Sequence, residues 1–464
     1  MKNILKIASL LAAAGMLFAC EKAAPVGDLQ LNIDKVRILA DGKDSVKFVV
    51  LWENTDVTAS AVIDAENVLT GQKFSVEGAG FSTTEESIYR FSVTYNEDYV
   101  AKLVVAKKVI VDANADIATS FKMSADKDVI QANGQDAAVL KVLLEGFDIT
   151  SAADIYTEDD ELLNLKDGKF TTNATGEHKF YADFGTLSTY NKNADDNGLF
   201  VIKAISVAVP DAVEDPQVEN TSFNHRTFLT QYTGTGCGYC PYMIRILREI
   251  MSKNLIPEKA VLAAVHSYGS GDPAYISVPK VSNYPYLQLD FVQGFSHSQS
   301  STVLETLIGE RTAEAAKAGI SVAPAYYPAE GLLVVKVAVK AAVDGVFNVG
   351  AWLLEDNIIG QQSDYDNIGD DTYDEHENCV RIADSKYVHN KATTWFGYEL
   401  GTLSKGRSAE KIFVMKIDKK WKAENLHLAV FASYGEGTGT RLTYSVCNAV
   451  DVPITEPTPF EYAK

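Results

Sequence analysis

The chain has 464 residues, of which 46% are hydrophobic and 22% are charged, a composition typical of folded domains and not of a disordered chain. At roughly 150 residues a domain, this length predicts about three domains. The formal net charge of −20 argues against binding to nucleic acid and against binding to anionic lipid through charge.

The first stretch has the pattern of a bacterial lipoprotein signal peptide. Two lysines precede an apolar run, residues 7–18, that is too short to cross a bilayer. The run ends close to Cys20, and this ending resembles a lipobox, in which the cysteine is acylated with fatty acids such as palmitate. We therefore expect residues 1–19 to be the signal peptide, Cys20 to be the lipidation site and residues 20–27 to be a tether. The alternative is an ordinary signal peptide with an incidental cysteine.

An internal repeat follows, with a constant offset of 92 residues. The offset aligns Asp41 with Asn133, Gly42 with Gly134, Asp44 with Asp136, and Asp56 with Asp148. Each copy has short alternating apolar runs separated by Gly, Asn and Asp, which predicts one β-sandwich over residues 28–112 and another over 113–208. The copies resemble bacterial immunoglobulin-like domains, and this resemblance implies a spacer. A glycan- or protein-binding module is the alternative.

The next segment contains the chemistry-bearing motif. Residues 209–222 include two prolines among acidic residues and predict a linker. A predicted strand at 228–232 then leads into Cys237-Gly-Tyr-Cys240, and apolar residues recur after it at helical spacing. Amide groups at a helix start stabilise a thiolate, so we expect Cys237 to be the more exposed and more acidic thiol. Cys240, one turn further in, would close the disulfide with Cys237.

The pair could also be half of a zinc site, which would require a second C-x-x-C or a nearby histidine pair. The sequence contains neither, so we expect no metal and no cofactor.

The elements after the cysteine pair predict an α/β domain followed by strands. Residues 260–266 read as a buried strand, 287–292 as another strand and 300–316 as a helix. From residue 319 onward, β-branched runs alternate with Gly, Asp and Asn turns. We therefore expect an α/β domain over 223–318 and a C-terminal β-sandwich with a frayed tail over 319–464.

Thr233-Gly-Thr-Gly-Cys-Gly-Tyr-Cys-Pro241 resembles a thioredoxin-fold active site. More closely, it resembles that of the outer-membrane-protein-28-related lipoproteins of Bacteroidetes. Further parallels lie at residues 283–285, 355–361 and 376–381, and the resemblance covers about 223–455. It implies a thioredoxin-like domain over 223–318 in a lipid-anchored protein of the outer membrane, on either the periplasmic face or the cell surface.

The same resemblance assigns roles to two further residues. In thioredoxin folds a cis-proline faces the cysteine pair and presents backbone to a bound peptide, and Pro285 stands at the matching place. The alternative is an ordinary loop proline. Thioredoxins also carry a buried carboxylate six residues before the first cysteine, where this chain has Gln231. A glutamine cannot accept the proton of the resolving thiol, so the departure favours slow exchange or a structural disulfide.

Two other features leave alternatives open. Cys379 and Cys447 both lie in predicted strands, and they either form a disulfide or remain two buried free thiols. The acidic run 364–377 has oxygen ligands at alternate positions, as calcium loops do, but it does not match the EF-hand pattern. A solvated acidic loop is the interpretation we favour.

The sequence therefore predicts a multidomain, exported, lipid-anchored lipoprotein. The first hypothesis for its function is thiol–disulfide exchange with the thiols or disulfides of exported proteins. Cys237 would attack, Cys240 would resolve, and Pro285 would seat the peptide. The second hypothesis is an adhesion or assembly protein that uses a thioredoxin fold as a non-catalytic scaffold. Gln231 favours the second hypothesis, and the spacing of the two cysteines favours the first.

Overall fold

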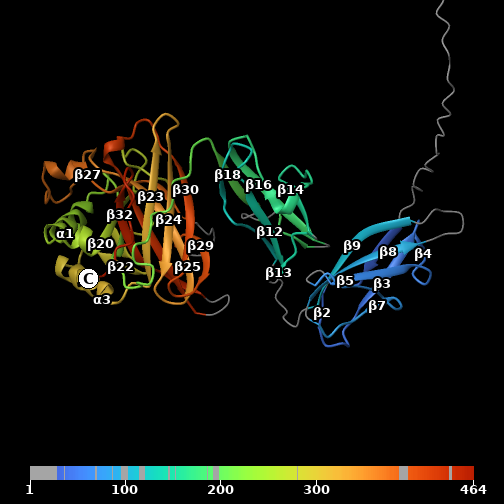
Figure 1. The fold of residues 1–464 in the computed structure, drawn as a ribbon. Coiled ribbons are helices and arrows are strands. Elements are labelled where there is room, and N and C mark those ends of the chain that lie inside the picture. The colour runs from blue at the N-terminus through green and yellow to red at the C-terminus, as the bar shows by residue number, and fades with distance from the viewer. Residues whose placement is uncertain are drawn as a thin grey trace, which may run out of the picture. The chain divides into compact units, whose positions relative to one another are not determined.

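The computed structural model describes residues 29–463, apart from 36, 68–69, 86, 96–102, 114–120, 145–146, 152, 185–186, 192–197, 279–280, 386–395 and 438–441. The predicted signal peptide, the tether and Cys20 lie outside the described residues. The chain divides into two compact units: one comprises Met1–Asp126, Ala137–Phe170 and Glu177–Ile202, and the other comprises Lys127–Asp136, Thr171–Gly176 and Lys203–Lys464. Several separate sheets dominate the fold, so the predicted β-rich, multidomain class is confirmed (Figure 1).

The first copy of the repeat forms two sheets. One has the strand order β1-β3-β4, with β7 also paired to β3, and the other has the order β2-β9-β8-β5-β6. Alternate residues of β3 and β8 are buried, as the alternation of apolar residues predicts. The rings of Phe48 and Phe91 meet in the core at 4.7 Å. The strands are β1 (Leu29–Ile33), β2 (Arg37–Ile38), β3 (Val46–Trp52), β4 (Thr55–Asp56), β5 (Val62–Asn67), β6 (Lys73–Ser75), β7 (Gly80–Phe81), β8 (Ser87–Tyr95) and β9 (Leu103–Ala113).

The second copy also forms two sheets. One has the order β10-β12-β13, with β15 on β12, and the other has the order β11-β18-β16-β14, with β17 on β16. Its elements are β10 (Phe121–Ala125), β11 (Val129–Gln131), β12 (Ala138–Leu144), β13 (Phe147–Asp148), β14 (Asp154–Thr157), a 3₁₀ turn (Lys166–Gly168), β15 (Lys169–Phe170), β16 (Gly176–Phe184), β17 (Leu187–Ser188) and β18 (Phe200–Ile205).

The turns of the two copies are built by the same hydrogen bonds. Gly42 and Gly134 both adopt a positive φ, +72° and +70°, a backbone conformation that favours glycine. Strand register repeats as well, since Leu51 faces Asp56 and Leu143 faces Asp148. Three hydrogen bonds from backbone amides to side chains in the first copy have counterparts in the second. Val50 N to Thr58 Oγ1 corresponds to Val142 N to Thr150 Oγ1. In the same way, Leu39 N to Asp44 corresponds to Gln131 N to Asp136, and Lys47 N to Asp34 corresponds to Val139 N to Asp126. The offset of 92 therefore relates equivalent structural positions.

A nine-stranded sheet forms the centre of the C-terminal region, with the main order β22-β21-β19-β20-β28-β25-β31-β32 and with β29 paired to β25. Its first part is a β–α–β unit in which β19 (Thr227–Thr233) and β20 (Ala260–His266) are parallel and are joined through α1 (Cys240–Ser252). Next, β21 (Tyr286–Leu289) runs antiparallel to β19 and forms a hairpin with β22 (Gln293–Ser296), and α3 (Ser301–Ala313) follows.

The remaining elements complete this sheet and add a three-stranded sheet with the order β23-β24-β30. They are α2 (Leu255–Glu258), β23 (Ala318–Tyr327), β24 (Leu332–Ala341), β25 (Gly345–Glu355), β26 (Ile358–Ile359), a 3₁₀ turn (Asp371–Asp374), β27 (Glu375–His376), β28 (Cys379–Asp384), β29 (Tyr398–Leu403), β30 (Ser408–Lys416), a 3₁₀ turn (Ala423–Asn425), β31 (Leu426–Glu436) and β32 (Thr443–Pro453).

Helices α1 and α3 cover the same part of the large sheet (Figure 1). The apolar positions that the sequence spaces at three and four residues in α1 are the ones that are buried, including Met243, Leu247 and Ile250. They pack with Leu304 and Ile308 of α3 and with side chains of β19, β20 and β21. A second core lies between strands β25, β31 and β32 and the three-stranded sheet.

Two expectations for this region need correction. A boundary was predicted at residue 318, but β20 pairs directly with β28 through Ala264 and Cys379, so one sheet crosses that boundary. The tail is not frayed either. Thr458 bridges Val322, Tyr462 bridges Phe223, and the Phe460 side chain is buried. The prolines near the end direct the tail along β23 and do not detach it from the fold.

Lys340 of β24 holds both the predicted linker and the tail. Its ammonium is buried and donates to the Asp215 carboxylate at 2.8 Å, to the carbonyls of Gln217 and Val218, and to the Tyr462 hydroxyl at 3.1 Å. The Tyr462 hydroxyl also donates to Asp215 at 2.6 Å. A buried ammonium needs such partners because burial removes its hydration.

We predict that Lys340→Ala destabilises the C-terminal unit by about 3–5 kcal/mol, because it leaves a partly buried Asp215 carboxylate without its cation. Guanidinium unfolding, followed by tryptophan fluorescence, measures this loss. The matched control is Lys416→Ala at an exposed position of the neighbouring strand β30, which should change stability by less than about 0.5 kcal/mol. Equal effects of the two substitutions would show that the Lys340 contacts contribute nothing.

Candidate functional site around the Cys237–Cys240 disulfide

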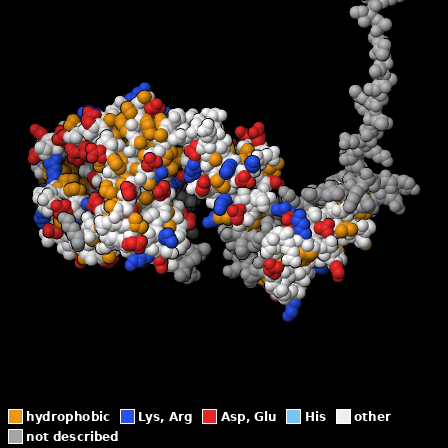
Figure 2. All heavy atoms as spheres, in the orientation of Figure 1, with side chains coloured by type: hydrophobic (Ala, Val, Ile, Leu, Met, Phe, Trp, Pro, Cys, Tyr) orange, Lys and Arg blue, Asp and Glu red, His pale blue; other side chains and the backbone are white. Residues whose placement is uncertain are grey.

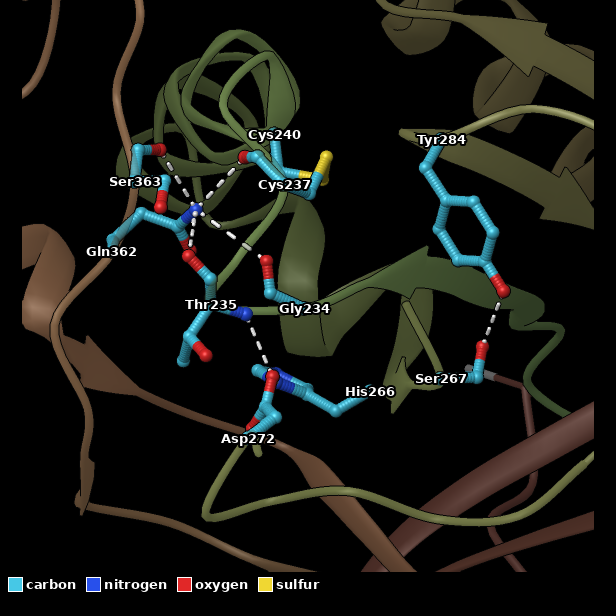
Figure 3. The surroundings of a disulfide bond; sticks show 10 residues. All are labelled: Gly234, Thr235, Cys237, Cys240, His266, Ser267, Asp272, Tyr284, Gln362 and Ser363. Carbon is cyan, nitrogen blue, oxygen red and sulfur yellow. Dashed lines mark hydrogen bonds and ion pairs between the residues drawn. A yellow bond between two sulfur atoms is a disulfide. The ribbon is translucent and has the colours of Figure 1, made fainter. Parts of the chain in front are cut away.

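Cys237 and Cys240 form a disulfide on the turn between β19 and α1, with their Cα atoms 5.4 Å apart (Figure 3). The turn begins with Gly234, whose carbonyl accepts the Cys237 amide at 2.9 Å, and helix α1 begins at Cys240. The sequence-predicted pairing, turn and helix are therefore all present. Pro241 occupies the first turn of the helix, where a missing amide hydrogen costs nothing.

The exposure of the pair differs from the prediction. The order is as expected, since Cys237 is 3% exposed and Cys240 is fully buried. The expectation of an accessible Cys237 on an exposed turn is nevertheless wrong, because surrounding segments cover it. Apart from the Tyr268 ring, the cover consists of chain that lies more than 100 residues further along the sequence, and local sequence patterns gave no indication of it.

Gln362 is the first part of this cover. Its Nε2 lies within hydrogen-bond distance of four carbonyl oxygens: Cys237 at 3.0 Å, Ser363 at 3.0 Å, Thr235 at 3.3 Å and Gly234 at 3.5 Å (Figure 3). The side chain is 8% exposed. The amide shares its two hydrogens among these oxygens, three of which also accept a backbone N–H, so it adds a link between Gln362 and the cysteine turn.

The backbone beside Gln362 and two aromatic rings complete the cover. Ser363 N donates to Thr235 O at 2.7 Å, and Tyr365 N donates to Gly238 O at 3.1 Å. The Tyr365 ring lies so close to Gly238 that a methyl group there would collide with it. On the other side, the Tyr268 ring contacts the position of Gly236. A side chain at position 238 would therefore displace the Tyr365 ring, and no positive φ is involved.

A buried histidine–aspartate pair, His266 and Asp272, holds the cysteine turn through a hydrogen bond to its backbone. His266 Nδ1 lies 2.8 Å from Asp272 Oδ2, and the same carboxylate accepts Thr235 N at 2.6 Å and Ala274 N at 2.8 Å (Figure 3). Burial would raise the pKa of Asp272, but the hydrogen bond from His266 and the two amides outweigh it and lower the pKa to about 2. Asp272 therefore holds a negative charge beside the cysteine turn.

Cys379 lies next to this pair, with its Sγ 3.5 Å from His266 Nε2, and burial holds the pKa of its thiol well above the usual range. Cys379 and Cys447 are both free and buried, so the alternative of a disulfide between them is wrong. Strands β25 and β31 separate β28 from β32. Three steps between strands correspond to about 14 Å, whereas a disulfide needs Cα atoms within about 7 Å.

Pro285 lies at the same edge of the sheet as the cysteine turn. The Tyr284–Pro285 peptide bond is cis, as the resemblance implied, and Pro285 is buried. The next residue, Tyr286, faces Tyr232 of β19, five positions before Cys237. The Tyr284 hydroxyl lies 2.9 Å from Ser267 Oγ, which ties the proline loop to the end of β20 (Figure 3).

Gln231 is buried and lines a cavity of about 80 Å³ between α1 and strands β19 and β20. Thr233, His266 and His376 line the same cavity. Gln231 Nε2 and Thr233 Oγ1 are buried without a hydrogen-bond partner, and a polar cavity of this size accommodates water that would satisfy them. The side chain at this place carries no charge, so it cannot take a proton from Cys240.

The acidic run 364–377 has a structural role in the cover. Asp370 caps the 3₁₀ turn by accepting Thr372 N, Tyr242 of α1 donates to Asp366 at 2.8 Å, and Arg248 of α1 donates to the Thr372 carbonyl at 2.7 Å. Within the described ranges, no group of three or more His, Cys, Asp or Glu side chains could hold a metal ion. In the same ranges, no helix is long and apolar enough to span a membrane.

The comparisons with known proteins leave the site unassigned. No family model and no curated protein matches the sequence. Among solved structures, invasin, a bacterial integrin-binding protein, matches 68% of this chain and 57% of its own at 11% identity and a TM-score of 0.17. Trypsin-activated alpha-2-macroglobulin from Escherichia coli matches 93% of this chain and 35% of its own at 8% identity and a TM-score of 0.16. This chain thus spans less than two thirds of either structure, and these scores support no argument about fold or function.

Sequence reasoning missed the residues that come from distant segments. No sequence pattern indicated that His266 and His376 lie together, yet their rings meet edge to face at 5.0 Å. Gln362 directly follows the run 355–361 that the resemblance singled out, and its side chain is the one that bonds to the carbonyl oxygens of the cysteine turn.

We predict that Gln362→Ala destabilises the fold by about 0.5–1.5 kcal/mol and speeds reduction of the disulfide, because it removes the side-chain donor that links Gln362 to the cysteine turn and leaves these carbonyl oxygens with their backbone donors alone. Thermal unfolding and the rate of reduction by dithiothreitol measure the two effects. The control is Gln361→Ala, an exposed neighbour that should behave like the parent chain. If both variants are reduced at the parent rate, Gln362 does not protect the disulfide.

Proposed function

We propose that this protein is an exported, lipid-anchored protein whose Cys237–Cys240 pair exchanges disulfides with the thiols or disulfides of exported proteins. The observation that carries the proposal is the arrangement of the disulfide at the N-terminus of α1 with the Pro285 loop at the same sheet edge. The order of elements, a β–α–β unit followed by a β-hairpin and a helix, supports a thioredoxin-like interpretation of this region.

The chemistry balances without a cofactor. In the reduced protein, the Cys237 thiolate attacks one sulfur of a substrate disulfide, and the leaving substrate thiolate takes up a proton. Cys240, as a thiolate, then attacks the Cys237 sulfur and releases the second substrate thiolate. The substrate gains two electrons and two protons, and the pair becomes the disulfide present in the structure. Pro285 would seat the substrate backbone beside Cys237.

A second candidate function is a non-catalytic surface protein that keeps the disulfide for stability. Two observations favour it. Cys237 is 3% exposed beneath the cover formed by Gln362 and Tyr365, and Gln231 offers no charge to the resolving thiol. Adhesion or assembly would then depend on other surfaces of the chain, and the immunoglobulin-like interpretation of the N-terminal copies is part of this proposal.

Reactivity and reduction potential separate the two candidates. If the pair exchanges disulfides, the reduced protein should show preferential alkylation of Cys237 by iodoacetamide, and its potential should lie above about −300 mV. Helix α1 begins at Cys240 and directs amide groups toward Cys237, which favours the Cys237 thiolate. Labelling of both cysteines only after unfolding, or a potential below that value, supports the structural disulfide and refutes exchange.

The lipid anchor is tested separately. We predict that the parent chain sediments with outer membranes and that Cys20→Ser releases it into the soluble fraction, because the apolar run before Cys20 would be removed with the signal peptide. Mass spectrometry of the N-terminal peptide should show acyl chains on Cys20 of the parent only. A Cys20→Ser variant that stays in the membrane fraction would show that another feature attaches the protein.

A further inference from the structure

The surface around the disulfide is unusually rich in exposed tyrosines. Among the described residues, the large hydrophobic side chains that are exposed include four tyrosines: Tyr239 at 49%, Tyr268 at 47%, Tyr275 at 37% and Tyr365 at 65%. Tyr239 lies between the two cysteines, and the rings of Tyr268 and Tyr365 contact the glycines on either side of Cys237. The rings of Tyr239, Tyr268 and Tyr365, which we call the tyrosine surface, are therefore contiguous with the disulfide.

A groove beside α1 extends this surface. It has a volume of about 730 Å³, and its lining includes Tyr239, Tyr242, His297 and Asp366. The Tyr239 and His297 rings lie nearly parallel at 18° with centroids 6.5 Å apart, and Tyr365 meets Tyr239 edge to face at 5.3 Å. Arg245 also lines the groove, and its guanidinium lies over the Tyr242 ring. Aromatic faces, carboxylates and the Arg245 guanidinium therefore meet in one hollow that begins at Tyr239, between the two cysteines.

The charge around the tyrosine surface is strongly negative. The segment 364–377, which forms one edge, contains seven Asp and Glu residues and no Lys or Arg. Asp366, Asp370, Asp371 and Glu375 are exposed. In Figure 2, acidic side chains gather at the end of the C-terminal unit where Figure 1 labels β27. Tyrosine faces and carboxylates together attract Lys and Arg side chains, through cation–π contacts and through charge.

We propose that the tyrosine surface and its acidic edge form the docking site for a cationic, unfolded segment of an exported protein that carries the reacting cysteine. The inference rests on the proposed exchange function and names its substrate class. Tyrosine suits this role, because it offers a large contact area at low conformational-entropy cost and tolerates varied sequences. Charge complementarity selects a basic segment over an acidic one, and continuity with Cys237 delivers the segment to the reacting sulfur.

Docking also accounts for the buried disulfide. Tyr365 is held by its backbone bond to Gly238, while its own ring is 65% exposed. A bound segment that stacks on Tyr239 and Tyr365 would replace the contact between the Tyr365 ring and Gly238 and open a path to Cys237. Substrate binding and access to the sulfur would then be one event.

The test measures docking without chemistry. Fluorescent twelve-residue unstructured peptides, with Ser in place of Cys and with four Lys, four Glu or neither, are titrated into the full chain carrying Cys20→Ser, followed by anisotropy. We expect the lysine peptide to bind about tenfold more tightly than the glutamate peptide, with the difference shrinking at high salt. Tyr239→Ala and Tyr365→Ala should each weaken binding about two- to fivefold, and Tyr239→Phe should restore it.

The charge component has its own matched control. The combined variant Asp366→Asn, Asp370→Asn and Asp371→Asn should bring the two affinities close together. Glu330→Gln with Glu424→Gln, at exposed positions away from the disulfide, should leave them unchanged. Equal binding of all three peptides by the parent chain, or insensitivity to both tyrosine changes, overturns the proposal. So does tyrosine-dependent binding to phosphatidylcholine vesicles without peptide binding, since it assigns the surface to lipid.

Failure of the exchange function gives a different pattern. Peptides with a disulfide report exchange by trapping of a mixed disulfide with Cys237 in a reduced Cys240→Ser variant, which lacks the resolving thiol. If trapping occurs without charge preference, exchange stands and the docking proposal falls. If the lysine peptide binds through Tyr239 and Tyr365 but no mixed disulfide forms at any pH, exchange falls, and with it the assignment of the bound segment as a substrate.

Discussion

The pairing of β28 with β20 is the constraint on which the site depends. Parallel strands β19 and β20 end at the same edge of the sheet, and loops that follow such ends gather there. Cys379, the first residue of β28, faces Ala264 of β20, and Ala264 N donates to Asn378 O at 2.8 Å. The chain between β25 and β28 must therefore return to the edge that carries the cysteine turn. Without this pairing, segment 356–378 would have no reason to lie over the disulfide.

The cover over the disulfide is polar, and this has consequences for access. A hydrophobic cover would expel water and hold through area alone, whereas this cover depends on the amide of Gln362 and on backbone bonds from Ser363 and Tyr365. Each of these bonds can be exchanged for a bond to water or to a bound backbone at modest net cost. A site closed in this way is protected from small reactants at rest, yet it remains able to open for a partner that supplies replacement bonds.

The parts of the structure that the sequence predicted are local in the chain. The strand before Cys237, the apolar face of α1 and the strand from Ala260 follow from periodicity within short windows, and the equivalence of Gly42 and Gly134 follows from a repeated turn motif. The missed features are long-range. Neither the bonds between Gln362 and the cysteine turn nor the sheet that crosses residue 318 has a local signature, because strand order is set by tertiary packing. The same reason made the pairing of Cys379 with Cys447 undecidable from the sequence.

On the proposed exchange function, the electrostatics around Cys237 would couple substrate binding to the reactivity of its thiol. The start of α1 favours a thiolate at Cys237, while the Asp272 carboxylate beneath Thr235 and the acidic segment 364–377 oppose it. Gln231 adds no charge to either side. A docked cation would offset the opposing carboxylates and leave the helix terminus dominant. If the proposed exchange takes place, the thiolate at Cys237 would be favoured most when a basic segment occupies the surface, and the negative charge that attracts the segment would make the sulfur less reactive in its absence.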